Sequence, residues 1–180
     1  EVTDSFNDQN QDKVIYGIYD PDANDFNLNM WSNSDGSEIK EIIKRINRLE
    51  LSNFAEEIFI NTILSYSYLP KGLTDKEFLD IKINWLINNK KDELLEEFLN
   101  KNESFYKKKR VIQYLVDKNI AKANLNDGCK KISFIGKDIK DSYLEKFKIY
   151  CLVFNDKKNQ AQLLYDILKE QKLSDKFFDD

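Results

Sequence analysis

The sequence has 180 residues, of which 41% are hydrophobic and 33% are charged, so it can form one domain with an apolar core and a solvated helical surface. The formal net charge of −4 argues against binding to double-stranded nucleic acid, which depends on a basic face. Only five Gly and two Pro are present, too few for the tight turns of a sandwich or barrel, and this favours an all-α fold. The longest apolar runs are too short to cross a bilayer, so no membrane span is expected.

Residues 1–33 are predicted to form an extended or disordered N-terminal strap ahead of the helices. The segment Glu1–Gln11 is almost wholly polar, whereas Lys13–Tyr19, KVIYGIY, is apolar enough to dock on a surface. This second segment either packs along the helical body or adds as a strand to a partner. Because the chain begins with Glu rather than Met, we also expect that an upstream segment such as a signal peptide has been removed.

The segment after the strap contains part of a calcium-loop pattern. Three side chains match the first, third and fifth ligand positions of such a loop, namely Asp20, Asp22 and Asn24. The sixth position holds Asp25 where the loop needs glycine, and the twelfth holds Trp31 where a bidentate glutamate should be. The pattern therefore favours an Asx-rich turn over a calcium site, and no metal site is predicted.

Apolar residues at helical spacing, separated by polar turns, predict about eight helices after residue 34. The clearest helix starts are Ser52, which can act as an N-cap, and Thr74, which forms a capping box with Glu77 in the run TDKE. The expected helices cover residues 39–49, 52–66, 74–87, 94–99, 104–121, 124–136, 138–154 and 161–168, and residues 174–178 begin a further one.

The last two of these helices are expected to form a hairpin. The apolar stripe of the first helix consists of Leu144, Phe147, Cys151 and Phe154, and that of the second of Ala161, Leu164, Ile167 and Leu168. Neither stripe can be buried alone. The two helices must therefore pack on each other and then on neighbouring helices, as they do in a stacked helical array.

Segments that begin at Trp85, Tyr114 and Tyr150 can be laid over one another at separations typical of helical repeats. Through Trp85, Leu86, Ala161 and the polar turn Asn155–Lys158, the chain resembles tetratricopeptide and Sel1-like repeats. This resemblance implies an α-α superhelix, a solenoid with a concave face. Residues 147–170 are also similar to repeat segments of exported alphaproteobacterial proteins, which implies a periplasmic or envelope location.

Candidate catalytic chemistry is sparse in this sequence. It contains no His, which removes the commonest general base and metal ligand, and it shows no nucleophile elbow, Walker loop or dinucleotide fingerprint. Cys129 and Cys151 lie on the stripes of two helices that should be neighbours, where they are either two buried thiols or a disulfide. No enzyme activity and no cofactor are therefore predicted.

A binding face is the remaining candidate site. If the third, fifth and seventh helices line a concave face, its exposed polar residues are Lys82, Arg110, Gln113, Asp117, Lys146 and Lys148. Arg110 closes the basic run 107–110, which follows two aromatic residues. This run could bind an acidic peptide or a phosphate backbone, although such a run is more often a solvated first turn of a helix.

Taken together, the patterns predict a non-enzymatic protein–protein interaction scaffold. Residues 34–180 would be its helical-repeat domain, as a fragment of a longer envelope protein with a protein or peptide partner. One alternative is a helical accessory domain of an envelope enzyme whose catalytic part lies outside this chain. Another is an RNA-binding helical repeat, against which the acidic balance weighs.

Overall fold

The computed structural model describes residues 15–136 and 139–179, and these residues are helical, which confirms the all-α class. The expected docking strap is described from Ile15 onward, while the polar segment Glu1–Gln11 lies outside the described residues. The chain divides into two compact units, Glu1–Glu103 and Ser104–Asp180. The predicted boundary between residues 33 and 34 falls inside the first unit, because Ile18 and Leu28 form backbone hydrogen bonds with Leu64 and Tyr68.

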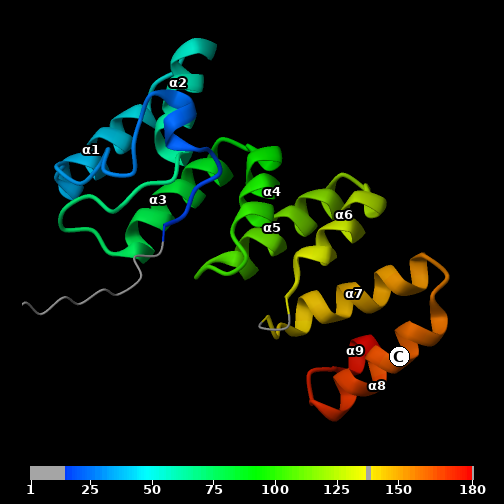
Figure 1. Ribbon diagram of the computed structural model, residues 1–180. Helices are drawn as coiled ribbons and strands as arrows, with labels where there is room; N and C mark the ends of the chain where they lie inside the picture. Colours follow the sequence, from blue (N-terminus) through cyan, green and yellow to red (C-terminus); the bar gives the residue numbers. More distant parts are fainter. Residues whose placement is uncertain (1–14, 137–138, 180) are drawn as a thin grey trace, which may run out of the picture. The chain divides into compact units, whose positions relative to one another are not determined.

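Unit 1 contains four α-helices and a short 3-10 helix (Figure 1). Their bounds are η1 Pro21–Asn24, α1 Gly36–Ile46, α2 Asn53–Leu64, α3 Asp75–Asn88 and α4 Asp92–Lys101. Residues with almost no exposed surface form its core, and they come from α2, α3 and α4: Ile63, Leu64, Leu79, Ile83, Leu86, Leu95 and Phe98. Since these apolar positions recur every three or four residues, each helix turns one stripe inward.

The helix starts of unit 1 follow from side-chain capping. The hydroxyl of Ser52 accepts a hydrogen bond from Ala55 N, 3.3 Å away, at the start of α2. The predicted capping box at Thr74 is confirmed, because Glu77 N donates to Thr74 Oγ1 and Thr74 N donates to Glu77 Oε2. Hydrogen bonds from Lys40 and from Thr74 lower the pKa of Glu77 to about 2.

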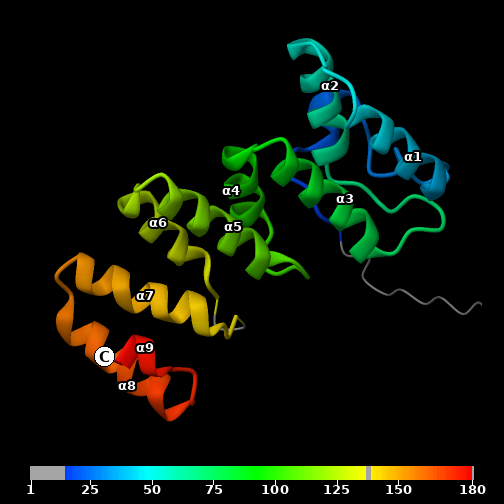
Figure 2. The same cartoon turned by 180° about the vertical axis from the view of Figure 1, so that it is seen from behind.

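Unit 2 consists of two helical hairpins and a final turn of helix, seen from the other side in Figure 2. Its elements are α5 Lys108–Ala121, α6 Leu125–Lys131, η2 Ile132–Phe134, α7 Ser142–Phe154, α8 Lys158–Glu170 and α9 Lys176–Asp179. The apolar residues Val111, Ile112, Leu115 and Val116 of α5 are buried. Between α7 and α8, Ile149, Ala161 and Leu168 form a second core cluster.

Two helices of unit 2 begin later than their apolar patterns predict. α5 starts at Lys108 rather than near Ser104, because the preceding residues place the Phe105 side chain in the core in a non-helical conformation. α7 starts at Ser142 rather than near Asp138, because the carboxylate of Asp141 accepts from Leu144 N and caps the helix there. The non-helical backbone before α5 and the side-chain cap before α7 therefore set these two boundaries.

The predicted hairpin stripes are only partly buried. Leu144, Phe147 and Cys151 are buried on α7, but Phe154 is 46% exposed. Phe154 is the last residue of its helix, and its ring stacks on that of Tyr150 at a centroid distance of 6.3 Å. The end of α7 thus carries exposed aromatic surface instead of core.

Candidate functional site

The six residues predicted to share a concave face are divided between the two units. Lys82 belongs to unit 1 and the other five belong to unit 2. Contrary to the prediction of an exposed side chain, Lys82 is 1% exposed. It is buried because its Nζ donates to Tyr16 O at 2.6 Å and to Ser65 O at 3.4 Å, and lies 4.7 Å from the centre of the Phe78 ring. Lys82 is therefore a structural residue of unit 1 and not part of a surface.

Gln113 and Asp117 join α5 to the start of α7 within unit 2. Gln113 Nε2 donates to Asp141 Oδ1 at 3.2 Å, and the Tyr143 hydroxyl donates to the carboxylate of Asp117. Burial alone would raise the pKa of Asp141, but hydrogen bonds from Leu144 N, Lys109 and Gln113 outweigh it and lower that pKa. Both predicted residues are thus engaged in holding two helices together, whereas Arg110 on α5 is exposed.

Lys146 is engaged in a similar way at the C-terminal end of the chain. Its Nζ forms an ion pair with Asp175 and lies 5.6 Å from the centre of the Phe178 ring. Ser142 Oγ, one helical turn earlier on α7, donates to Leu173 O at 2.7 Å. These contacts fix the segment around α9 against α7, so Lys146 also has a structural partner.

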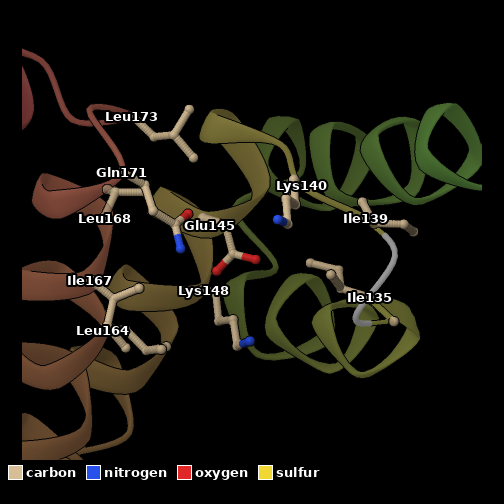
Figure 3. A pocket seen from close by; sticks show the side chains of 11 residues that line it. Ile135, Ile139, Lys140, Glu145, Lys148, Leu164, Ile167, Leu168, Gln171 and Leu173 are labelled. Carbon is tan, nitrogen blue, oxygen red and sulfur yellow. The ribbon is translucent and has the colours of Figure 1, made fainter.

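Lys148 lines a groove, and this groove is the candidate site. The groove has a volume of about 300 Å³ and lies between the segment that follows η2 and the helices α7 and α8. Its aliphatic floor consists of Ile135, Ile139, Leu164, Ile167, Leu168 and Leu173, and its polar rim of Lys140, Glu145, Lys148 and Gln171. Figure 3 shows Glu145 and Lys148 projecting from α7 between the floor residues Ile135 and Ile139 on one side and those of α8 on the other.

The four polar residues of the rim have no hydrogen-bonding or ionic partner in the described part of the chain. Among the residues that the structure describes, the side chains of Lys140, Glu145, Lys148 and Gln171 form no hydrogen bond or ion pair. Two ammonium groups and one carboxylate therefore face an apolar floor without being neutralised by neighbours. An arrangement of this kind can bind a ligand that supplies aliphatic surface and hydrogen-bonding or anionic groups.

Helical spacing explains how the sequence builds this groove. Glu145 and Lys148 are one turn apart on α7, on the flank of the stripe that buries Leu144 and Phe147. On α8 and at its C-cap, the pairs 164/167, 164/168, 167/171 and 168/171 are three or four residues apart, so Leu164, Ile167, Leu168 and Gln171 share one face. Sequence reasoning identified the aliphatic stripe of α8 and Lys148, but it missed Glu145 and Gln171, whose positions beside those stripes could have indicated them.

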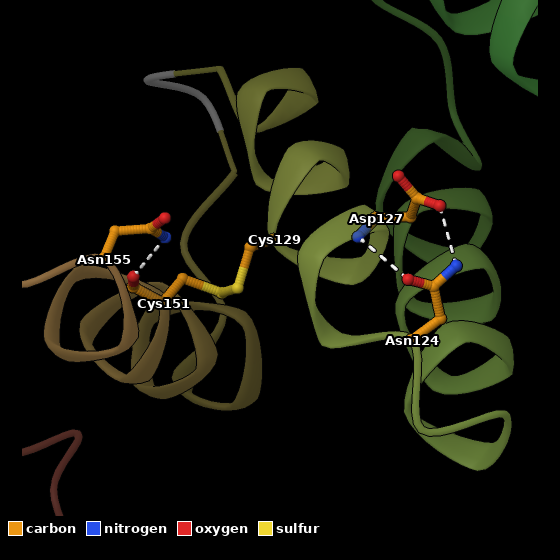
Figure 4. Close-up of a disulfide and its surroundings, with 5 residues drawn as sticks. All are labelled: Asn124, Asp127, Cys129, Cys151 and Asn155. Carbon is orange, nitrogen blue, oxygen red and sulfur yellow. Dashed lines mark hydrogen bonds between the residues drawn. A yellow bond between two sulfur atoms is a disulfide. The ribbon is translucent and has the colours of Figure 1, made fainter.

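A disulfide closes a loop of the chain that contains several residues of the groove. Cys129 on α6 and Cys151 on α7 are bonded, which is the second of the two arrangements considered from the sequence (Figure 4). The two cysteines are 22 residues apart in sequence, and the rim residues Lys140, Glu145 and Lys148 all lie between them. Next to the bridge, Asn155 Nδ2 donates to Cys151 O at 2.7 Å and covers the end of α7.

Unit 1 has a second groove, which is almost entirely apolar. It has a volume of about 270 Å³ and lies between α1 and α2, where Ile42 and Ile58 are about half exposed. The hydroxyl of Thr62, a polar group on its wall, already donates to Ile58 O at 2.7 Å. With no charged side chain on its wall, this groove offers burial but no means of orienting a ligand.

The partial calcium pattern is part of a turn in the structure. The carboxylate of Asp20 accepts from Asp22 N at 3.1 Å and caps η1, and Asn24 Nδ2 donates to Asp20 O at 3.5 Å. Over the described ranges, no group of three Cys, Asp or Glu side chains is placed to hold a metal ion.

Comparisons with protein-family models, with curated proteins and with solved structures find no match to this chain. The function must therefore be argued from its own residues. Within residues 15–136 and 139–179, no helix combines the length and the apolar character that crossing a bilayer requires.

Proposed function

We propose that the chain is a non-enzymatic protein-interaction module of the helical-repeat type, and that the groove beside α7 and α8 binds a peptide segment of its partner. The observation that carries this proposal is the pairing of an aliphatic floor with charged rim groups that lack internal partners. Water satisfies these accessible side chains in the free protein, and a bound peptide would replace that water with its own hydrogen-bonding groups.

The size and lining of the groove favour short aliphatic side chains. A volume of about 300 Å³ accommodates one or two such side chains, and Ile135, Leu164 and Ile167 would surround them with apolar surface. Burial of each additional methylene there contributes about 0.8 kcal/mol. This term would supply most of the affinity of the peptide.

The charges of the rim favour a peptide that also carries a carboxylate. Lys140 and Lys148 can each donate to a carboxylate, while Glu145 and the Gln171 amide can accept from backbone N–H groups of the peptide. Because the rim carries two positive charges and one negative charge, a negatively charged side chain or C-terminus is preferred over a positive one. Rim ion pairs contribute mainly to this selectivity, since exposed pairs are worth up to about 1 kcal/mol.

An exported location supports the same proposal. Disulfides persist in oxidising compartments such as the periplasm, and the Cys129–Cys151 bond encloses three of the rim residues. The periplasm or envelope is therefore the compartment in which we expect this groove to meet its partner.

The test starts from peptides selected against the wild-type chain in a random display library. Their dissociation constants are then measured by fluorescence anisotropy for the wild type and for the variants Ile167→Asp, Lys148→Glu and Leu163→Asp. Ile167 is on the groove floor and 38% exposed, whereas Leu163 is 61% exposed on the same helix but outside the groove, and so provides a matched control. We expect Ile167→Asp to weaken binding by about tenfold or more, because a carboxylate would occupy apolar surface.

Lys148→Glu should weaken binding of peptides with a carboxylate by about two- to fivefold and leave neutral peptides unaffected. Leu163→Asp should bind like the wild type. If the selected peptides bind all four proteins equally, or if selection yields no peptide with saturable binding, the proposed function is wrong.

A further inference from the structure

Within unit 1, residues 15–19 form backbone hydrogen bonds with residues 64–66, which follow or end α2. This segment runs beside α3 in dark blue in Figure 1 and pairs with the residues that follow α2. Ile18 N donates to Leu64 O at 2.8 Å, and Tyr66 N donates to Tyr19 O at 3.0 Å. These bonds form a single parallel bridge between Tyr19 and Ser65, and the backbone bends at Ile18 just before it.

Two buried side chains bind successive carbonyl groups of this segment. Lys82 Nζ donates to Tyr16 O at 2.6 Å, and Asn102 Nδ2 donates to Gly17 O at 2.9 Å. The exposed fractions of these side chains are only 1% and 6%. These donors therefore bind the backbone of the segment, and helices α3 and α4 hold them in place.

The packing around this segment also limits which side chains fit. A Cβ atom at Gly17 would lie 2.7 Å from Tyr66 N and 2.8 Å from Leu64 O, both of which are backbone atoms that cannot move aside cheaply. The next residue, Ile18, is only 4% exposed. The pattern that fits is thus a glycine followed by a large aliphatic residue.

Lys82 and Asn102 each have a second hydrogen-bond acceptor outside residues 15–19. Lys82 Nζ also donates to Ser65 O at 3.4 Å, and Asn102 Nδ2 also donates to Phe98 O at 2.8 Å. When residues 15–19 leave, each donor therefore keeps one acceptor in the body of unit 1. Departure frees Lys82 and Asn102 without leaving a buried donor wholly unsatisfied, which is what exchange of one peptide for another requires.

We propose that residues 15–19 occupy in cis a binding site for peptides, and that a segment of another polypeptide with glycine before a large aliphatic residue replaces them. Recognition by β-bridge pairing and backbone carbonyl capture is independent of whether the peptide is covalently attached. Attachment raises only the effective concentration of the cis segment. This inference concerns a site other than the groove of unit 2 and does not rest on the function proposed for that groove.

The test uses the full chain carrying Ile18→Asp, a change that weakens the binding of residues 15–19 to the rest of unit 1. The probe is a fluorescent peptide of residues 13–20, KVIYGIYD. We expect saturable binding of the peptide to this variant, measured by anisotropy, and binding at least tenfold weaker to the wild type, whose own segment competes. A matched peptide with valine in place of glycine, KVIYVIYD, should not bind, because its Cβ would meet the backbone of Tyr66.

A second measurement does not depend on how well the variant folds. The wild-type chain is mixed with excess peptide that carries a photoreactive benzophenone in place of Tyr16, and cross-links are mapped by mass spectrometry. Exchange predicts cross-links to residues near Lys82 and Ser65, which are suppressed by unlabelled KVIYGIYD but not by KVIYVIYD. Absence of these cross-links, or equal suppression by both peptides, would overturn the proposal, as would equal binding of the two peptides to Ile18→Asp.

Discussion

Lys82 shows at the residue scale how burial changes the chemistry of a single side chain. Its Nζ is surrounded by protein and bonded to two neutral carbonyl groups, and this desolvation lowers the pKa of Lys82 to about 7. The sequence contained a sign of this position, because Phe78, Leu79, Trp85 and Leu86 all lie three or four residues away on the same helix. Helical spacing thus places Lys82 within the apolar stripe of α3.

The lowered pKa predicts a pH-dependent stability. Between about pH 7 and the usual lysine value of about 10.4, the unfolded chain binds a proton at Lys82 that the folded chain does not. The free energy of unfolding should therefore rise with pH in this window, by up to about 1.4 kcal/mol per pH unit. Below about pH 7, Lys82 should contribute nothing to the slope of this free energy with pH. Urea unfolding followed by circular dichroism between about pH 7 and 9.5 measures this slope.

Lys82→Met should remove this part of the slope, since methionine has no proton to bind. Lys44→Met is the matched control, because Lys44 has a side chain that is 60% exposed and is solvated in both states. Above about pH 10 the trend should reverse, since burial raises the pKa values of Tyr16, Tyr19 and Tyr66 in the folded chain. A slope that persists unchanged in Lys82→Met would show that another group causes it.

At the element scale, the disulfide is the main constraint between helices of unit 2. It links α6 to α7 and closes a loop with a sequence separation of 22 residues. In the chain-entropy model, a loop of this length stabilises the folded state by roughly 3 kcal/mol. We expect the double variant Cys129→Ser, Cys151→Ser to lose about this amount of unfolding free energy.

Reduction provides the matched comparison for this prediction. A reductant should lower the Tm of the wild type toward that of the double variant and leave the Tm of the double variant unchanged. Two reactive thiols in the unfolded, unreduced wild type would contradict the disulfide directly. A wild-type Tm that does not respond to the reductant would show that the bond contributes little to stability.

Helix boundaries at this scale were predictable where a capping residue coincides with the start of an apolar pattern. Ser52 and Thr74 are such positions, and α2 and α3 begin directly after them. The start of α7 was placed too early, because the sequence offers two possible N-cap residues, Asp138 and Asp141, and the structure shows that Asp141 caps the helix. The apolar stripe of α8 predicted the part of the groove floor that this helix forms. Ile135 and Ile139, which complete the floor, lie outside the helices, so no helical spacing in the sequence indicated them.

At the scale of the whole molecule, composition was enough to predict the all-α class, because few glycines and prolines accompany many helical stripes. The division into two units after Glu103 was not predicted. It depends on which stripes meet in space, and the apolar spacing of single helices does not contain that information. For the same reason, six polar residues on three predicted helices could not be assigned to one face.

A nuclear magnetic resonance titration tests most directly whether the groove beside α7 and α8 binds a peptide. The full ¹⁵N-labelled chain is titrated with the best peptide selected against the wild type. We expect saturable amide shift changes concentrated at Ile139, Lys140, Glu145, Lys148 and the floor residues of α8. These changes should be lost in Ile167→Asp and retained in Leu163→Asp. Shift changes centred on the groove between α1 and α2, or unchanged spectra at saturating peptide, would contradict it.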